Sequence, residues 1–296
     1  MTDVEANISQ PKTAFALLGH DLRLEILLAL LDRWEAAHTE PQRYSELMRA
    51  VEIQDSGKFN YHLGKLCGAY VQKVDGGYVP TASATALYRA VLAHRPTVPP
   101  NRTELTPGVA CPSCTEDLIA TYEQEFFTLS CPGCEDVSGE FTYPLPKNAL
   151  DGRTDREVLR VVHDRARAHV GLARRGQCPD CTGITTVTVR RDALESGSDP
   201  PVVITCDTCT WRVESGVLLP LLTDAYVTKA LADIGVALED CYLWTLPDPE
   251  VTVAATDPVQ FDISFEGDGG VAVVTVDDGL TVLATNTGDI DRTGNA

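Results

Sequence analysis

Eight of the ten cysteines fall into two arrays, each with two CxxC pairs joined by a spacer of 16 residues in the first array and 24 in the second. A CxxC turn presents two thiolates to one point, and zinc binds four thiolates in a tetrahedron. Each array therefore predicts one structural zinc ion. The predicted ligands are Cys111, Cys114, Cys131 and Cys134 in the first array, and Cys178, Cys181, Cys206 and Cys209 in the second.

Disulfides are the alternative use of these cysteines. The acidic N-terminus, "MTDVEANISQ", lacks the pattern of a signal peptide, so we expect a cytoplasmic chain whose thiols stay reduced. A thioredoxin-like redox pair is disfavoured because no strand–helix pattern follows any pair. A zinc ion with four cysteine ligands has no open coordination position for a substrate. We therefore expect both modules to be structural or to bind a partner. Cys67 and Cys241 lie beside apolar residues, and we expect both to be buried thiols.

Short strands must position these cysteines. The first spacer contains "LIATY" and "FFTLS", and the second contains "GITTVTVR" and "PVVIT". A hairpin between the two pairs of one array brings the four sulfurs together, so residues 111–134 and 178–209 are predicted to be zinc ribbons.

The remaining C-terminal elements surround these ribbons. Residues 153–172 predict a helix that buries Val158, Leu159, Val162, Ala166 and Val170. Its many arginines indicate either a solvated face or a second nucleic-acid contact. "VLLPLLTDAYVTKALADIG" predicts a helical segment, and "YLWTL", "VTVAA", "VQFDISF", "VAVVTV" and "LTVLAT" predict a small antiparallel sheet.

The N-terminal third predicts four helices, a hairpin and a helix. Periodicity over residues 11–32 indicates two helices divided near Gly19, and "YSELMRAV" predicts a short third helix. In the next helix, "GKFNYHLGKLCGAY", Phe59, Leu63 and Leu66 share one face and should point to the core. "DGG" between "YVQKV" and "GYVPT" is a strong hairpin signal, and residues 81–94 return to helix.

That order predicts a winged helix-turn-helix. "ALLGHDLRLEILLAL", "SGKFNYHLGKL" and "GGYVPT" resemble the ArsR-type winged-helix transcription regulators, in the versions common in haloarchaea. The resemblance covers residues 12–94 and implies DNA binding. It places Ser56, Lys58, Asn60 and Tyr61 at base-facing positions and Lys65 and Lys73 near phosphates. His62 matches a position where the family commonly has His, and we expect it to be a packing residue rather than a direct contact. Most helix-turn-helix proteins read two half-sites, so we expect a homodimer, with an effector ligand that the sequence does not identify. "YSELMRAVEI" lacks the cysteine pair of the metal-sensing members, which argues against metal sensing there.

The charge distribution supports a DNA partner for this region alone. The chain has a formal net charge of -19 and few lysines, which is typical of proteins from salt-loving microbes. Residues 1–95 hold 11 acidic and 10 basic side chains, whereas residues 96–296 hold 32 and 14. Residues 54–95 are basic, as a surface that meets phosphates would be.

These observations predict an α+β chain with a winged helix over 1–95, a proline-rich linker over 96–109, a zinc-ribbon region with a small sheet over 110–285, and a disordered tail over 286–296. We expect a sequence-specific DNA-binding transcription regulator, repressor-like, that does not span a membrane. The alternative is an interaction module that binds transcription or translation machinery without reading DNA sequence. We find no phosphate-binding glycine loop, HExxH or GxSxG motif, so we expect no enzyme.

Overall fold

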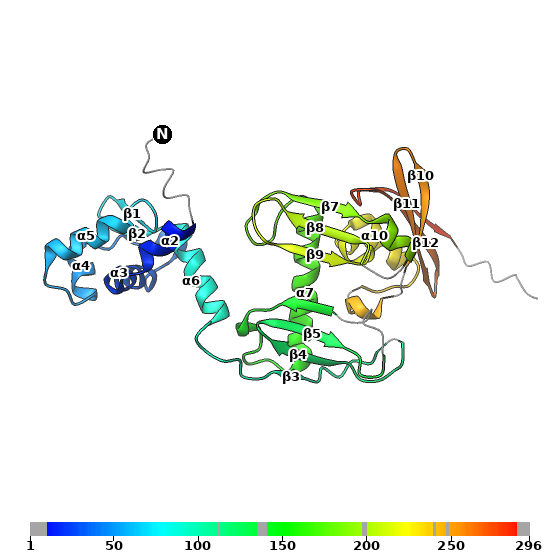
Figure 1. The fold of residues 1–296 in the computed structure, drawn as a ribbon, viewed down its shortest axis with the longest axis horizontal. Helices are drawn as coiled ribbons and strands as arrows, with labels where there is room; N and C mark the ends of the chain where they lie inside the picture. Colours follow the sequence, from blue (N-terminus) through cyan, green and yellow to red (C-terminus); the bar gives the residue numbers. More distant parts are fainter. Residues whose placement is uncertain are drawn as a thin grey trace, which may run out of the picture. The chain divides into compact units, whose positions relative to one another are not determined.

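The computed structural model contains helices and several small antiparallel sheets (Figure 1). It divides into two compact units, Met1–Pro99 and Pro100–Ala296. No helix in the described part of the chain is long and apolar enough to cross a membrane. The described residues are 11–111, 113–134, 141–196, 200–238, 241–246 and 249–288.

The first unit contains five α-helices, one 3-10 turn and one hairpin among its described residues. The order confirms the predicted helices and the position of the hairpin. The elements are α2 (Pro11–Leu18), α3 (Asp21–Leu31), η1 (Ala36–His38), α4 (Tyr44–Ala50), α5 (Ser56–Leu66), β1 (Val71–Val74), β2 (Gly77–Pro80) and α6 (Ala82–His94).

Helix α5 is anchored in the core of the first unit by its apolar face. It begins where the Asp55 carboxylate accepts a hydrogen bond from the Lys58 amide at 2.9 Å. Phe59, Leu63 and Leu66 are each no more than 1% exposed, as predicted. These contacts fix the rotation of α5 about its axis and therefore decide which side chains face outward.

Helix α4 is tied to the start of α5. The Tyr44 hydroxyl donates a hydrogen bond to the Ser56 carbonyl, and the Tyr44 ring meets the Phe59 ring edge-on at 4.9 Å. This hydrogen bond and ring contact hold the two short helices in a defined relation across the turn between them.

The hairpin is held against the segment before α4. Gln42 and Tyr78 exchange two backbone hydrogen bonds, of 3.0 and 2.9 Å. Gly77 lies between the chains at this point, where a β-carbon would come within 2.2 Å of the Gln42 carbonyl oxygen. The glycine is therefore required by the close approach of two backbones.

The second unit contains three sheets, whose described strands pair in sequence order. The first holds β3 (Glu104–Leu105), β4 (Ile119–Glu123), β5 (Phe126–Ser130) and β6 (Phe141–Pro144). The second holds β7 (Thr185–Val189), β8 (Val202–Cys206) and β9 (Arg212–Ser215). The third holds β10 (Glu250–Thr256), β11 (Val259–Gly267), β12 (Gly270–Asp277) and β13 (Val282–Gly288).

Helix α7 (Asp155–Arg174) links the cores of the second unit (Figure 1). It begins at a capping box in which Thr154 and Glu157 bond each other's backbone amides. Its first half packs on the first sheet through Val158, Leu159, Val162 and Ala166. Val170 and Ala173 in its second half join the core between the other two sheets, with α9 (Leu218–Leu221) and α10 (Ala225–Asp233). The predicted apolar face of this helix is confirmed.

Three segments differ from expectation or extend beyond it. The prediction of a strand at "YLWTL" is wrong: Leu243–Thr245 form a 3-10 turn, η4, because Tyr242 and Trp244 stack on each other and the Leu243 amide bonds His163 at 3.2 Å. Part of the expected linker 96–109 pairs as β3 with β4. Residues 286–288 of the expected tail belong to β13, and 289–296 lie outside the described residues.

We predict that Gly77→Ala destabilises the first unit by about 3 kcal/mol, because the new methyl group would separate the hairpin from Gln42 and break two hydrogen bonds. The measurement is urea unfolding of the full chain followed by circular dichroism. Gly64→Ala is the matched control, since nothing lies within 4 Å of its site in α5. The control should raise the free energy of unfolding of the first unit by up to about 1 kcal/mol, because Ala favours a helix more than Gly does. An unchanged transition in Gly77→Ala would contradict the account.

Candidate metal centres and nucleic-acid interface

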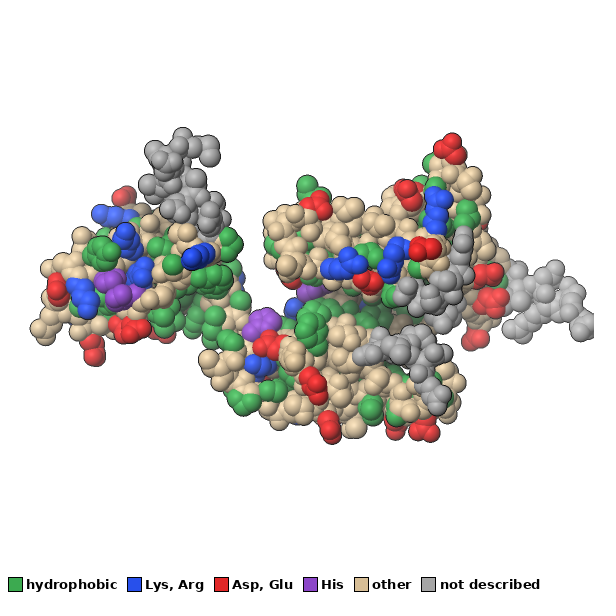
Figure 2. Space-filling view, viewed as in Figure 1, with side chains coloured by type: hydrophobic (Ala, Val, Ile, Leu, Met, Phe, Trp, Pro, Cys, Tyr) green, Lys and Arg blue, Asp and Glu red, His purple; other side chains and the backbone are tan. Residues whose placement is uncertain are grey.

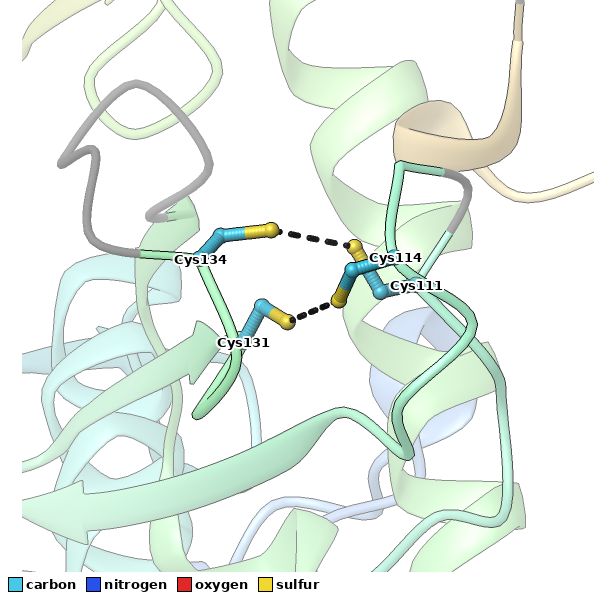
Figure 3. Close-up of side chains that lie close together, drawn as sticks. All are labelled: Cys111, Cys114, Cys131 and Cys134. Atoms are coloured by element: carbon cyan, nitrogen blue, oxygen red, sulfur yellow. Dashed lines mark hydrogen bonds between the residues drawn. The ribbon is translucent and has the colours of Figure 1, made fainter.

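The first cysteine group gathers at the end of the β4–β5 hairpin (Figure 3). Cys111 and Cys114 precede β4, and Cys131 and Cys134 follow β5. The Cys111 and Cys134 sulfurs are 3.7 Å apart, and the Cys114 and Cys131 sulfurs are 3.2 Å apart. Four thiolates about 2.3 Å from one ion would be separated by about 3.8 Å. A disulfide requires about 2.05 Å, so the geometry is that of a metal site rather than of bridges.

The second cysteine group repeats this arrangement on the β7–β8 hairpin. The Cys178 and Cys209 sulfurs are 3.7 Å apart, and the Cys181 and Cys206 sulfurs are 3.5 Å apart. Within each group the ligating atoms lie within 4.8 Å of one another. The structure therefore brings all eight predicted ligands together in the two predicted sets.

The described residues of the first turns of the two groups, "CPSCT" and "CPDCT", make matching backbone hydrogen bonds. Thr115 and Thr182 both have positive φ, 65° and 59°, and each amide donates to the carbonyl of the first cysteine at 3.0 Å. In return, the Cys111 amide donates to the Glu116 carbonyl and the Cys178 amide to the Gly183 carbonyl. A similar turn thus presents two sulfurs in both modules. This repetition was not predicted, although both sequences contain "CPxCT".

Backbone amides at each site favour the thiolate form. The amides of Cys114 and Ser113 lower the pKa of Cys111 to about 6. The amides of Cys209 and Thr208 lower the pKa of Cys206 to about 7. Hydrogen bonds with the neighbouring thiols of its group raise the pKa of Cys134 to about 12. Four thiolates in one small volume would also repel one another. A bound dication removes that repulsion.

This donor set fits a closed, four-coordinate ion and is consistent with zinc. Backbone packing supports each site, because a β-carbon at Gly133 would lie 3.1 Å from the Cys114 sulfur, and one at Gly183 would lie 3.2 Å from the Cys181 sulfur. All four positions of a tetrahedron are taken by protein sulfurs, so the arrangement can stabilise a fold or hold a surface rigid. It offers no open position for chemistry on a substrate.

The predicted DNA-contact residues of α5 are all exposed. Tyr61 is 61% exposed, and the Lys65 ammonium nitrogen lies 5.6 Å from the centroid of the Tyr61 ring. Lys73 is exposed on β1, opposite Tyr78. Figure 2 shows Lys, Arg and His side chains gathered on one face of this unit. The exposed predicted residues of α5 are Ser56, Lys58, Asn60, Tyr61 and Lys65.

Two expectations about polar residues need correction. Cys67 is exposed rather than buried, because α5 ends at Leu66 and the chain turns outward there, and Cys241 is only partly buried. Several arginines of α7 do not form a solvated face or a cationic surface, because their side chains bind carbonyl and carboxylate groups within the second unit. Arg167 donates to the Leu222 carbonyl, and Arg174 donates to the Leu280 carbonyl and pairs with Asp224 at 3.0 Å.

An aromatic cluster around His163 was not predicted. The His163 ring is 1% exposed and lies edge-on to Tyr242 and Trp244. Burial lowers the pKa of His163 to about 4, so it is neutral at physiological pH and accepts the hydrogen bond from the Leu243 amide. Its Nε2 has no hydrogen-bond partner among the described residues. Because these contacts span 80 residues, local sequence patterns carried no signal for them.

We predict that the purified chain contains two zinc ions and that Cys131→Ser reduces the content to one, because the substitution removes one of four thiolates. Cys241→Ser is the matched control and should keep two, since Cys241 belongs to neither group. Elemental analysis by mass spectrometry measures the content. A metal-free chain whose eight cysteines are oxidised to disulfides would contradict the prediction.

Comparisons with known protein families give two matches. The model described as domain of unknown function DUF7351 matches residues 108–282, which is more than half of the chain. The model described as domain of unknown function DUF7347 matches residues 11–91, which include all the described helices of the first unit except the end of α6. No curated protein and no solved structure matches the chain. The first of these matches covers both cysteine groups and most of the third sheet, and the chain belongs to the DUF7351 family.

Proposed function

We propose that the chain is a sequence-specific DNA-binding transcription regulator that acts as a repressor-like promoter binder. The observation that carries the proposal is the two-sided character of α5. Its apolar side is locked in the core, while Ser56, Lys58, Asn60, Tyr61 and Lys65 are exposed together on the outside. A rigid helix with polar, cationic and aromatic side chains on one open face matches what a major groove accepts.

The neighbouring elements support a winged helix-turn-helix. Helix α4 would cross the DNA backbone, α5 would enter the major groove, and the β1–β2 hairpin would act as the wing. The proposal follows the resemblance to ArsR-type regulators in the sequence. It also follows the short turn between α4 and α5, which the bond from Tyr44 to Ser56 stabilises.

The exposed side chains divide into two roles. The Asn60 amide can bond the N6 and N7 edge of adenine, and the Lys58 ammonium can bond the acceptors of guanine. Lys65 and Lys73 are placed to contact phosphates, which fix register without reading sequence. None of these three lysines forms a salt bridge within the described residues, so each is available to an anionic partner.

We propose that each cysteine group holds one structural zinc ion and that residues 111–134 and 178–209 are zinc ribbons. The sulfur separations of 3.2 to 3.7 Å and the amide-stabilised thiolates support this assignment. A cytoplasmic location would keep the thiols reduced and able to bind metal. The ribbon region then gives rigidity, dimer contacts or an effector surface.

Charge determines how such a protein can approach DNA. Residues 96–296 hold 32 acidic and 14 basic side chains, and this surface would repel phosphates. In the proposal this region faces away from the duplex, and a homodimer places two copies of α5 on two half-sites. The acidic, lysine-poor composition suits a haloarchaeal cytoplasm, where molar salt screens the self-repulsion.

The alternative is an interaction module that binds transcription or translation machinery. One observation favours it: Ile184, next to the first cysteine pair of the second group, is 69% exposed and offers an apolar contact. Under this alternative the outer face of α5 has no role in DNA recognition. The alternative therefore requires that changes at Lys58 and Tyr61 leave partner binding intact.

We predict that selection from random duplex DNA in molar potassium chloride enriches a motif, with an inverted repeat if the protein is a dimer. The double change Lys58→Ala and Tyr61→Ala should abolish the enrichment, because it removes a base contact and an aromatic contact while leaving the buried face of α5 unchanged. Sequencing of the selected pool provides the measurement. A folded, zinc-loaded protein that enriches nothing would point to the interaction module.

We also predict a shallow salt dependence of binding. Each phosphate contact contributes about -0.9 to the slope of log affinity against log salt, so the two exposed lysines placed near phosphates, Lys65 and Lys73, give about -2 per bound protomer. Fluorescence anisotropy over a range of potassium chloride concentrations measures the slope. A slope several times steeper would show that binding depends on phosphate contacts far more than this surface allows.

A further inference from the structure

Two histidines stack where α3 meets α5. The His20 and His62 ring centroids are 4.0 Å apart, with 38° between the ring planes. His20 caps the start of α3, where its Nδ1 accepts a hydrogen bond from the Leu22 amide at 3.2 Å. His62 lies on α5, 7% exposed, and the Tyr61 ring meets it edge-on at 5.1 Å. The pair therefore lies directly beside the outer face of α5.

Buried nitrogens at this junction have no hydrogen-bond partner. They are Nδ1 of His62 and Nε of Arg23, which follows His20 on α3. Buried side-chain nitrogens nearly always have a partner in folded proteins, and an unpaired one costs free energy. The two nitrogens leave hydrogen-bonding capacity at this junction that no described group satisfies.

The same junction gathers positive charge that no carboxylate neutralises. Burial lowers the pKa of His62, and the neighbouring His20, Arg23 and Lys58 lower it further. No salt bridge involves Arg23 or Lys58 within the described residues, and none of the groups that shift the His62 pKa is acidic. In a chain with 43 acidic and 24 basic side chains, a cationic cluster of this kind is unexpected unless an anion binds there.

We propose that His20 and Arg23 form a phosphate-binding site at the α3–α5 junction, with His62 as the residue that positions His20. The ligand is a phosphate group with oxygens that accept several charged hydrogen bonds. In the functional complex it is a backbone phosphate of duplex DNA, so this inference rests on the proposed function. The source could also be free phosphate, and the experiment below separates the two.

Such a site makes DNA binding depend on pH. Without an anion, protonation of His62 adds repulsion to a cluster that is already cationic, so the free first unit loses stability as the pH falls. With a phosphate bound, this pH dependence is reversed, because an added proton then strengthens an ion pair. Since the pKa of His62 is lowered, we expect DNA affinity to rise about tenfold as the pH falls below the ordinary range of histidine titration.

The test compares DNA binding by the full chain and two variants on either side of the ordinary histidine pKa. His20→Asn keeps a side chain that caps a helix but cannot take up a proton. Arg23→Gln removes one cation and keeps both histidines. Arg33→Gln is the matched control, because Arg33 is exposed beyond the end of α3 and loses the same charge.

The inference predicts that wild type and Arg33→Gln gain affinity at low pH, whereas His20→Asn loses the gain and Arg23→Gln binds more weakly throughout. If wild type binds DNA with no pH dependence, or if His20→Asn keeps the full gain, the inference is overturned while DNA binding stands. Circular dichroism checks that each variant is folded.

A second measurement tests the phosphate site even if the chain binds no DNA and the proposed function fails. Nuclear magnetic resonance follows the imidazole signals of His20 and His62 against pH, with and without inorganic phosphate. An upward shift of both titration midpoints on adding phosphate would establish the anion site independently of DNA. Unchanged midpoints would overturn it.

Discussion

Helix α5 can bury only one of its faces, and the interpretation of this protein depends on that constraint. Phe59, Leu63 and Leu66 fill the core of the first unit and leave the helix no freedom to rotate. The polar side chains Asn60 and Tyr61 are consequently exposed on the outside of the helix. A small change in the packing of the three apolar residues would turn Asn60 and Tyr61 away from any partner. The surface proposed for recognition is thus a product of the core.

The second unit meets a different constraint, because its first two sheets are too small to stand alone. Short hairpins bury little apolar surface, and a cluster of four thiolates opposes folding unless a cation neutralises it. The two cysteine groups, with a metal ion bound in each as proposed, and α7 solve the two problems together. The cysteine groups close the ends of the hairpins, while α7 supplies Val158 and Leu159 to one core and Val170 to the other. The expected effect of metal loss is therefore on the fold of the second unit.

Local patterns in the sequence were sufficient for much of this structure. The CxxC spacing indicated both ligand sets, and the i, i+4, i+7 spacing of Phe59, Leu63 and Leu66 indicated the buried face of α5. Features that depend on distant contacts were missed. The stacking of Tyr242 on Trp244 converts an apparent strand into a 3-10 turn, and the carbonyl of Leu280 takes up Arg174 from more than a hundred residues away. The pairing of His20 with His62 belongs to the same class, since neither residue has a local pattern that indicates the other.

The central claim is that the outer face of α5 contacts DNA and that the acidic region does not. Hydrogen–deuterium exchange of the full, zinc-loaded chain with and without duplex DNA tests it most directly. The account predicts slower exchange in α5 and in the β1–β2 hairpin when DNA is added, with no change in β7, β8 or the β10–β13 sheet. Protection confined to the two cysteine modules, with α5 unaffected, would contradict it.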